Sequence, residues 1–149
     1  MEIGSIEKGK VGEMYVFMKL FQGGAVPFIP LADTKGVDAV VSKKDGTYVE
    51  IQVKATYPPE QAGYFNVRNL IPRKNLFIVC LIMDIEEIPE AWILPSIIFV
   101  DHAAKRKVDN KPVHLLSLGL GETKLEQSRR EKLTEYRENW SLLTGDTGI

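Results

Sequence analysis

The chain has little of what disulfide-rich, zinc-binding or membrane-spanning proteins require. Cys80 is the single cysteine among 149 residues, so no disulfide can form within the chain. Two histidines and the lack of a Cys-x-x-Cys pair argue against a zinc site. The longest apolar run, residues 76–83, is too short to cross a bilayer, and the first residues lack the layout of a signal peptide. We therefore expect no membrane segment and a reducing, cytoplasmic location.

The charge is close to balanced. A net charge of −1 provides no overall attraction to nucleic acid and argues against a nonspecific DNA coat, although local basic patches remain open. The hydrophobic content of 44% and charged content of 26% are ordinary for a globular protein. We expect one domain over residues 1–149, with residues 145–149 as a loose tail.

Two short strands joined by a turn are predicted in the stretch GVDAVVSKKDGTYVEIQVKAT, which begins at Gly36. A two-residue loop made of Asp45-Gly46 would pair Lys44 with Thr47. A three-residue loop, Lys44-Asp45-Gly46, would instead pair Lys43 with Thr47 and place glycine in the left-handed position at its end. The two registers differ by one residue and so put opposite sets of side chains on each face.

The hydrophobic pattern favours the three-residue loop, because one face of the hairpin is then apolar throughout. That face consists of Val37, Ala39, Val41, Val49, Ile51 and Val53. On the other face Asp38 lies opposite Gln52, and Glu50 and Lys54 are its diagonal neighbours at about 7–8 Å. We therefore expect acid, amide and amine side chains to converge on one face of this hairpin.

The rest of the chain alternates between predicted helices and strands. A helix over about residues 6–21, capped by Ser5, presents Glu13 beside the apolar stripe Val11, Met14, Met18 and Phe21, and Gly12 indicates close packing. Strands are predicted at 64–67, 76–83, 92–94 and 113–118, a short helix capped by Ser96 near 96–104, a basic loop at 105–112, and a long helix from Thr123 to Gly145. This order indicates an α/β or α+β fold with a mixed sheet and helices on its faces.

The motifs resemble those of the PD-(D/E)XK nuclease superfamily, which includes restriction endonucleases and archaeal Holliday-junction resolvases. The resemblance rests on Gly12-Glu13 in the first helix, on Gly36-Val37-Asp38, and on Glu50-Ile51-Gln52-Val53-Lys54 after the hairpin turn. It implies a restriction-endonuclease-like α/β fold with a central mixed sheet of four or five strands flanked by helices. It also implies a metal-dependent phosphodiesterase.

The resemblance implies roles for five residues. Asp38 matches the metal-binding acid, Lys54 the catalytic lysine, and Glu13 the helix glutamate of the resolvase-like branch. Gln52 takes the place of the second acid, where Glu or Asp is commoner, and the carbonyl of Val53 would be a further metal ligand.

The residues themselves support the same chemistry. Oxygen ligands from Asp38 and Gln52, with Glu13 or Glu50, suit Mg²⁺ or Mn²⁺. Such an ion activates water and neutralises phosphate charge, while Lys54 can stabilise the transition state. From its place in the register, Glu50 could also compensate for the neutral Gln52.

The expected function is a Mg²⁺-dependent DNA endonuclease in repair, recombination or restriction. The alternative is a nuclease-fold module without strong catalysis that binds nucleic acid or protein. Residues expected to contact DNA are Arg68, Arg73, Lys74, Lys105, Arg106 and Lys107. The resemblance also suggests a homodimer that cuts two strands.

Overall fold

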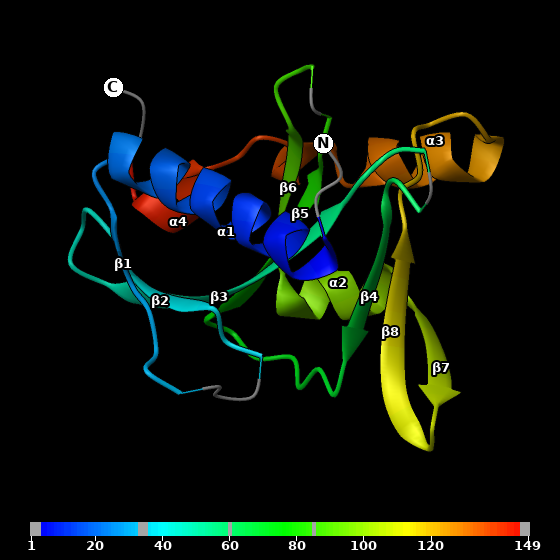
Figure 1. Ribbon diagram of the computed structural model, residues 1–149, viewed down its shortest axis with the longest axis horizontal. Coiled ribbons are helices and arrows are strands. Elements are labelled where there is room, and N and C mark those ends of the chain that lie inside the picture. Colours follow the sequence, from blue (N-terminus) through cyan, green and yellow to red (C-terminus); the bar gives the residue numbers. More distant parts are fainter. Residues whose placement is uncertain (1–3, 33–35, 60, 85, 147–149) are drawn as a thin grey trace.

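A five-stranded mixed sheet forms the centre of the protein (Figure 1). The computed structural model describes residues 4–32, 36–59, 61–84 and 86–146. The sheet has the order β1-β2-β3-β5-β6, in which β3 and β5 are parallel and the other neighbours antiparallel. Its strands are Val26–Phe28 (β1), Ala39–Ser42 (β2), Tyr48–Thr56 (β3), Leu76–Ile82 (β5) and Glu90–Pro95 (β6). The expected mixed sheet flanked by helices is thus confirmed.

A second, three-stranded antiparallel sheet was not foreseen from the sequence. It has the order β4-β8-β7, with strands at Tyr64–Arg68 (β4), Lys111–Ser117 (β8) and Ala104–Val108 (β7). The basic segment from Lys105 to Lys107, expected in a loop, therefore lies in a strand. Its pairing with β8 supplies the backbone partners that its polar sequence did not suggest.

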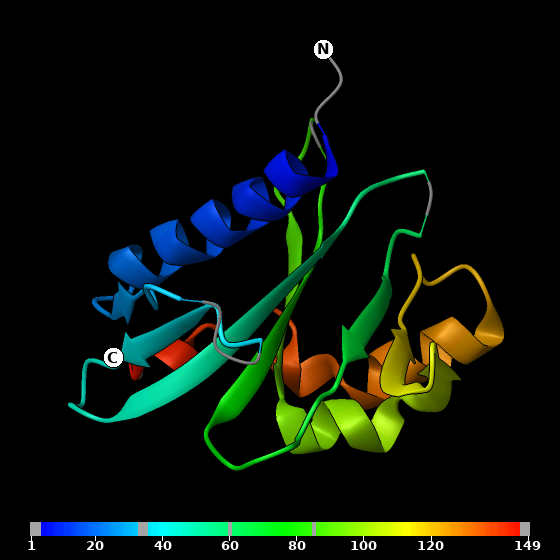
Figure 2. The same ribbon diagram turned by 60° about the horizontal axis from the view of Figure 1, so that its bottom comes forward.

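Helices cover the two faces of the five-stranded sheet unequally (Figures 1 and 2). Helix α1, Ser5–Gln22, packs on one face together with the short α4, Ser141–Thr144. The second sheet and helix α2, Ser96–His102, pack against the other face, where α3, Lys124–Lys132, also lies. Cys80 is buried there as a free thiol, as expected. None of the helices in the described part of the chain is long and apolar enough to cross a membrane.

The three-residue hairpin turn is confirmed. The Lys43 N–H donates to the Thr47 carbonyl at 2.8 Å, and Gly46 has the left-handed φ of 88° that this loop requires. The strands pair Val40 with Glu50, as the hydrophobic pattern predicts. The apolar face is buried at its centre, where Ala39, Val41 and Ile51 are each 0% exposed.

The prediction of which residues of the first helix are buried is wrong. Val11, Met14, Met18 and Phe21 are all exposed, whereas the buried face comprises Gly12, Val16, Phe17 and Leu20. Both sets follow helical spacing, so periodicity could not choose between them. Gly12 decides the outcome, because its missing side chain lets the helix approach β3 closely: a Cβ atom there would lie 2.8 Å from the Cβ of Ala55.

The expected long C-terminal helix is also wrong. It ends at Lys132, and the chain continues through a 3-10 turn, Thr134–Tyr136 (η1), before α4. The segment after η1 leaves the helical path to pair with the edge strand β6. The Glu138 N–H donates to the Ala91 carbonyl at 2.8 Å, and the Glu138 carboxylate accepts from the Ala91 N–H at 2.7 Å. The unpaired edge of β6 thus competes successfully with helix continuation.

The prediction that Ser5 and Ser96 cap their helices is also wrong, whereas the predicted capping box of α3 is confirmed. Gly4 and Pro95, not Ser5 and Ser96, occupy the N-cap positions of their helices. The Ser96 hydroxyl instead bonds the backbone of Arg73, because its side chain points into the protein and is fully buried. Thr123 accepts from the Glu126 N–H at 3.1 Å, as its sequence pattern predicts.

The close approach at Gly12 predicts opposite effects of two alanine substitutions in α1. Gly12→Ala should lower the free energy of unfolding by about 1 kcal/mol, because overpacking outweighs the gain of about 1 kcal/mol in helix propensity. Gly9→Ala, with nothing within 4 Å of the new Cβ, should raise it by about 1 kcal/mol. Urea unfolding of both variants measures the difference, and equal effects would contradict the close packing.

Candidate functional site

The register between β2 and β3 changes immediately before β2. The Asp38 N–H donates to the Ile51 carbonyl at 2.9 Å, although Ile51 is already the partner of Ala39. Two residues of one strand therefore face one residue of the other, which is the arrangement of a β-bulge. The expectation that Asp38 lies directly opposite Gln52 is wrong for this reason.

The bulge directs the Asp38 carboxylate to the edge of β3. Its Oδ2 accepts a hydrogen bond from the Val53 N–H at 2.7 Å. In an antiparallel ladder the N–H and C=O of one residue point to the same neighbouring strand. The Val53 carbonyl therefore faces the same edge as the Asp38 carboxylate, just beyond the end of β2.

Glu13 brings a second carboxylate to this edge from α1. Glu13 and Asp38 line a pocket of about 230 Å³ that also includes Lys10, whose Nζ lies 3.1 Å from the Glu13 carboxylate. The pKa of the Asp38 carboxyl is raised to about 6, chiefly by burial and also by the neighbouring Glu13 carboxyl. The Val53 N–H and the charge of Lys54 lower it. Two adjacent acids of this kind favour a bound cation.

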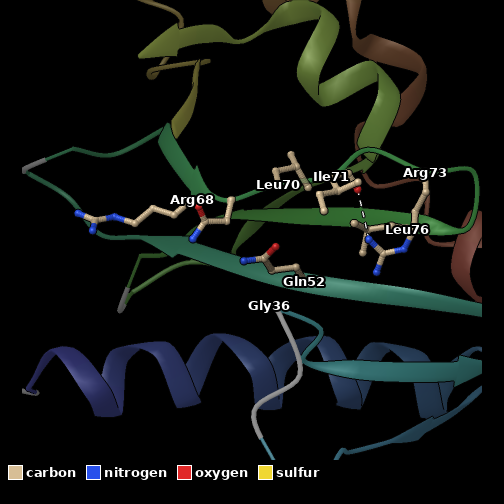
Figure 3. Close-up of a pocket in the computed structure, with 8 residues that line it drawn as sticks. Gly36, Gln52, Arg68, Leu70, Ile71, Arg73 and Leu76 are labelled. Carbon is tan, nitrogen blue, oxygen red and sulfur yellow. Dashed lines mark hydrogen bonds between the residues drawn. The ribbon is translucent and has the colours of Figure 1, made fainter. Parts of the chain in front are cut away.

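Gln52 lies on the opposite face of β3 from α1. Its side chain lines a pocket of about 640 Å³ between the first sheet and the connection from β4 to β5 (Figure 3). Gly36 closes one side, where a Cβ atom would lie 3.2 Å from the Gln52 Oε1; with a φ of 81°, this position favours glycine. The segment from Gly36 to Asp38 thus passes between the Gln52 amide on one side and the Val53 N–H on the other.

Glu50 forms an ion pair with Arg73, one of the residues that line this pocket. The Glu50 Oε2 accepts from Arg73 Nη2 at 2.6 Å. Arg73 Nη1 also donates to the Ile71 carbonyl at 3.2 Å (Figure 3). Ser96 fixes this arrangement by bonding both the N–H of Arg73, at 2.9 Å, and its carbonyl, at 2.8 Å. Glu50 therefore balances an arginine here. Ser96, which the sequence suggested only as a helix cap, acquires a positioning role.

Lys54 follows Gln52 on the same face of β3. It is paired with Cys80 in the parallel ladder, and its charge acts on the Asp38 carboxyl. Of the four residues expected on one face, Glu50, Gln52 and Lys54 share it, while Asp38 turns toward Glu13. The polar groups therefore approach the edge of β3 from both faces.

The residues expected to contact DNA fall into two groups. Arg68 and Arg73 line the Gln52 pocket, and Lys74 is exposed in the connection that forms its wall. Lys105, Arg106 and Lys107 lie on β7, in the second sheet.

The donors at the edge of β3 fit a hard divalent cation. No three His, Cys, Asp or Glu side chains within residues 4–32, 36–59, 61–84 and 86–146 are placed to hold a metal. The available set is instead the Asp38 and Glu13 carboxylates with the Val53 carbonyl, and the Gln52 amide lies on the opposite face of β3. Carboxylate, carbonyl and amide oxygens are ligands that Mg²⁺ and Mn²⁺ accept.

This arrangement of helix, hairpin and parallel strand is a restriction-endonuclease-like fold. The chain is similar in structure to a bacterial homing endonuclease, I-Ssp6803I, with a TM-score of 0.62. The match covers 97% of this chain and 94% of that chain at 20% sequence identity, and it establishes the fold. No protein-family model and no curated protein sequence matches the chain.

Proposed function

We propose that this protein is a Mg²⁺- or Mn²⁺-dependent endonuclease that hydrolyses phosphodiester bonds of DNA in repair, recombination or restriction. The observation that carries the proposal is the meeting of the Asp38 and Glu13 carboxylates with the Val53 backbone at the edge of β3. Lys54 and Gln52 flank this edge in the restriction-endonuclease-like fold. The similar structure is itself described as a homing endonuclease.

Each residue has a distinct role in this proposal. Asp38, Glu13 and the Val53 carbonyl would hold the ion at the edge of β3, and the Gln52 amide oxygen would be a further ligand from the opposite face of the strand. The bound ion would lower the pKa of a water molecule and neutralise phosphate charge. Lys54 places a positive charge beside the phosphate and stabilises the additional negative charge of the transition state. The half-buried setting of Asp38 strengthens these electrostatic effects.

A second candidate is a nuclease-fold module that binds nucleic acid or protein with weak or no catalysis. Two observations favour it. Gln52 is neutral and lies on the face opposite the Asp38–Glu13 pair, and Glu50 is engaged by Arg73 at 2.6 Å. Neither the amide nor the paired acid adds a free negative charge to the ion site, so metal affinity is the property that separates the two candidates.

Lys54→Met should reduce Mg²⁺-dependent cleavage of duplex, branched or single-stranded DNA by at least about 100-fold, as for the loss of a transition-state donor. The matched control is Lys44→Met, which removes an exposed lysine in the hairpin turn and should cleave like the parent. Cleavage is measured on labelled substrates with Mg²⁺, Mn²⁺ or EDTA. Cleavage that persists in both Lys54→Met and Asp38→Ala would assign the activity to another site.

Gln52→Glu should tighten Mn²⁺ binding by about tenfold, because it adds a negative ligand to the set. Gln22→Glu, an exposed change at the end of α1, provides the control for a nonspecific charge effect. Titration calorimetry with Mn²⁺ compares both variants with the parent. Unchanged or weaker affinity would show that Gln52 does not bind the ion. A parent that binds no Mn²⁺ and cleaves no DNA would favour the noncatalytic module.

We also propose that the protein acts as a homodimer through the outer face of α1. Met14, Met18 and Phe21 are 54%, 45% and 60% exposed at helical spacing. Met14 also lines the Glu13–Asp38 pocket, so a second copy on this face would adjoin the site.

Light scattering should find a dimer for the parent and a monomer for the Met18→Glu, Phe21→Glu variant. The control is Ile88→Glu, an apolar residue 85% exposed in the connection before β6. A monomeric parent would contradict the proposal.

A further inference from the structure

The outer face of the second sheet continues the wall of the Gln52 pocket. Arg68, at the end of β4, lines that pocket and is paired with Val113 of β8. Val113 is paired in turn with Arg106 of β7. The three residues therefore form one row across three strands and share one face of the sheet. The two arginines, both exposed, lie about 10 Å apart at the usual strand spacing.

Beyond this row the sheet narrows to a two-stranded ribbon. β4 ends at Arg68, whereas β7 and β8 continue through the pairs Lys107–Pro112 and Val108–Lys111. The tip is a tight turn in which Asp109 and Asn110 have positive φ values of 51° and 63°. Figure 1 shows this ribbon extending away from the rest of the protein at the lower right.

The ribbon is strongly basic in a chain whose net charge is −1. Counted with the rest of β7, the exposed basic residues are Lys105, Arg106, Lys107 and Lys111, and Asp109 is the single acid among residues 104–117. Every residue of β7 is exposed, so no layer of the described chain covers these charges. A polyanion is the partner that such a projecting surface fits.

The width of a two-stranded ribbon, compared with the widths of nucleic-acid grooves, indicates which polyanion it can enter. A two-stranded ribbon fits the major groove of B-form DNA, which is about 12 Å wide. The deep, narrow major groove of an RNA duplex would exclude it, and so would the DNA minor groove of about 6 Å.

We propose that the β7–β8 ribbon enters the major groove of duplex DNA while Arg68 and Arg106 contact the phosphates that lead to the Gln52 pocket. This inference rests on the proposed nuclease function. It assigns duplex DNA as the substrate of the nuclease, bound by the ribbon on one side of the cleavage site. Arg106 and Lys107 supply phosphate contacts. The tip, with Asn110 at its end, presents hydrogen-bonding groups to base edges.

The test measures binding and does not need cleavage. Fluorescence anisotropy with a labelled 30-base-pair duplex, in Ca²⁺ or EDTA, compares the parent with the Arg106→Gln, Lys107→Gln variant over a series of salt concentrations. Two lost phosphate contacts should lower the slope of log affinity against log salt by about 2 and weaken binding at least about tenfold. Lys44→Gln, in the hairpin turn far from the ribbon, is the control for the loss of an exposed positive charge elsewhere and should bind like the parent.

Dimethyl sulfate interference on the same duplex identifies the groove. Methylation at guanine N7, in the major groove, should block binding of the parent, whereas methylation at adenine N3, in the minor groove, should not. Asn110→Gly keeps the turn, because glycine accepts positive φ, and should lessen this base-specific interference with little change in salt slope.

The outcomes separate this inference from the proposed function. Equal binding by the double variant and the Lys44→Gln control, or interference at adenine N3 alone, would overturn the ribbon proposal even if the parent cleaves DNA. Loss of binding in the double variant without any cleavage by the parent would support the ribbon and overturn the nuclease. A parent that binds no duplex overturns the ribbon proposal, whereas the nuclease proposal is then decided by cleavage of branched and single-stranded DNA.

Discussion

The hydrogen bond from the Val53 N–H to the Asp38 carboxylate, 2.7 Å long, determines where the polar groups of this protein can meet. It exists because the bulge before β2 leaves the edge of β3 unpaired at Val53. An acid in a regular ladder would have pointed to the face of the sheet. Here it lies at the edge, where Glu13 from α1 and the Val53 carbonyl also lie. The candidate metal site is therefore a property of a strand end and not of a strand face.

The two faces of the sheet contribute differently to this edge. On the α1 side, Gly12 permits a close approach to Ala55, and that approach brings Glu13 near Asp38. On the other side, the second sheet and Ser96 hold the wall of the Gln52 pocket in place. The acids come from the α1 side and the arginines from the other.

Much of the fold could be predicted because it depends on local chemistry. The three-residue turn followed from Gly46 and from the apolar alternation of both strands, which one register alone satisfies. The β5 strand followed from its continuous apolar run, and the cap of α3 from Thr123. The second sheet could not be predicted, because β7 consists of exposed, mostly charged residues whose only reason to be a strand is pairing with β8. The break after α3 likewise depends on the distant backbone of Ala91.

The sequence by itself determined which residues are candidates for the site, namely Glu13, Asp38, Gln52 and Lys54, because their spacing around a glycine turn resembles a nuclease motif. It also determined the hairpin register, since a one-residue slip would have buried charged side chains. Only the tertiary structure decided which face of α1 is buried, that Glu50 is paired with Arg73, and that Asp38 leaves the face of Gln52. These outcomes depend on contacts between residues far apart in the chain, and no local periodicity encodes such contacts.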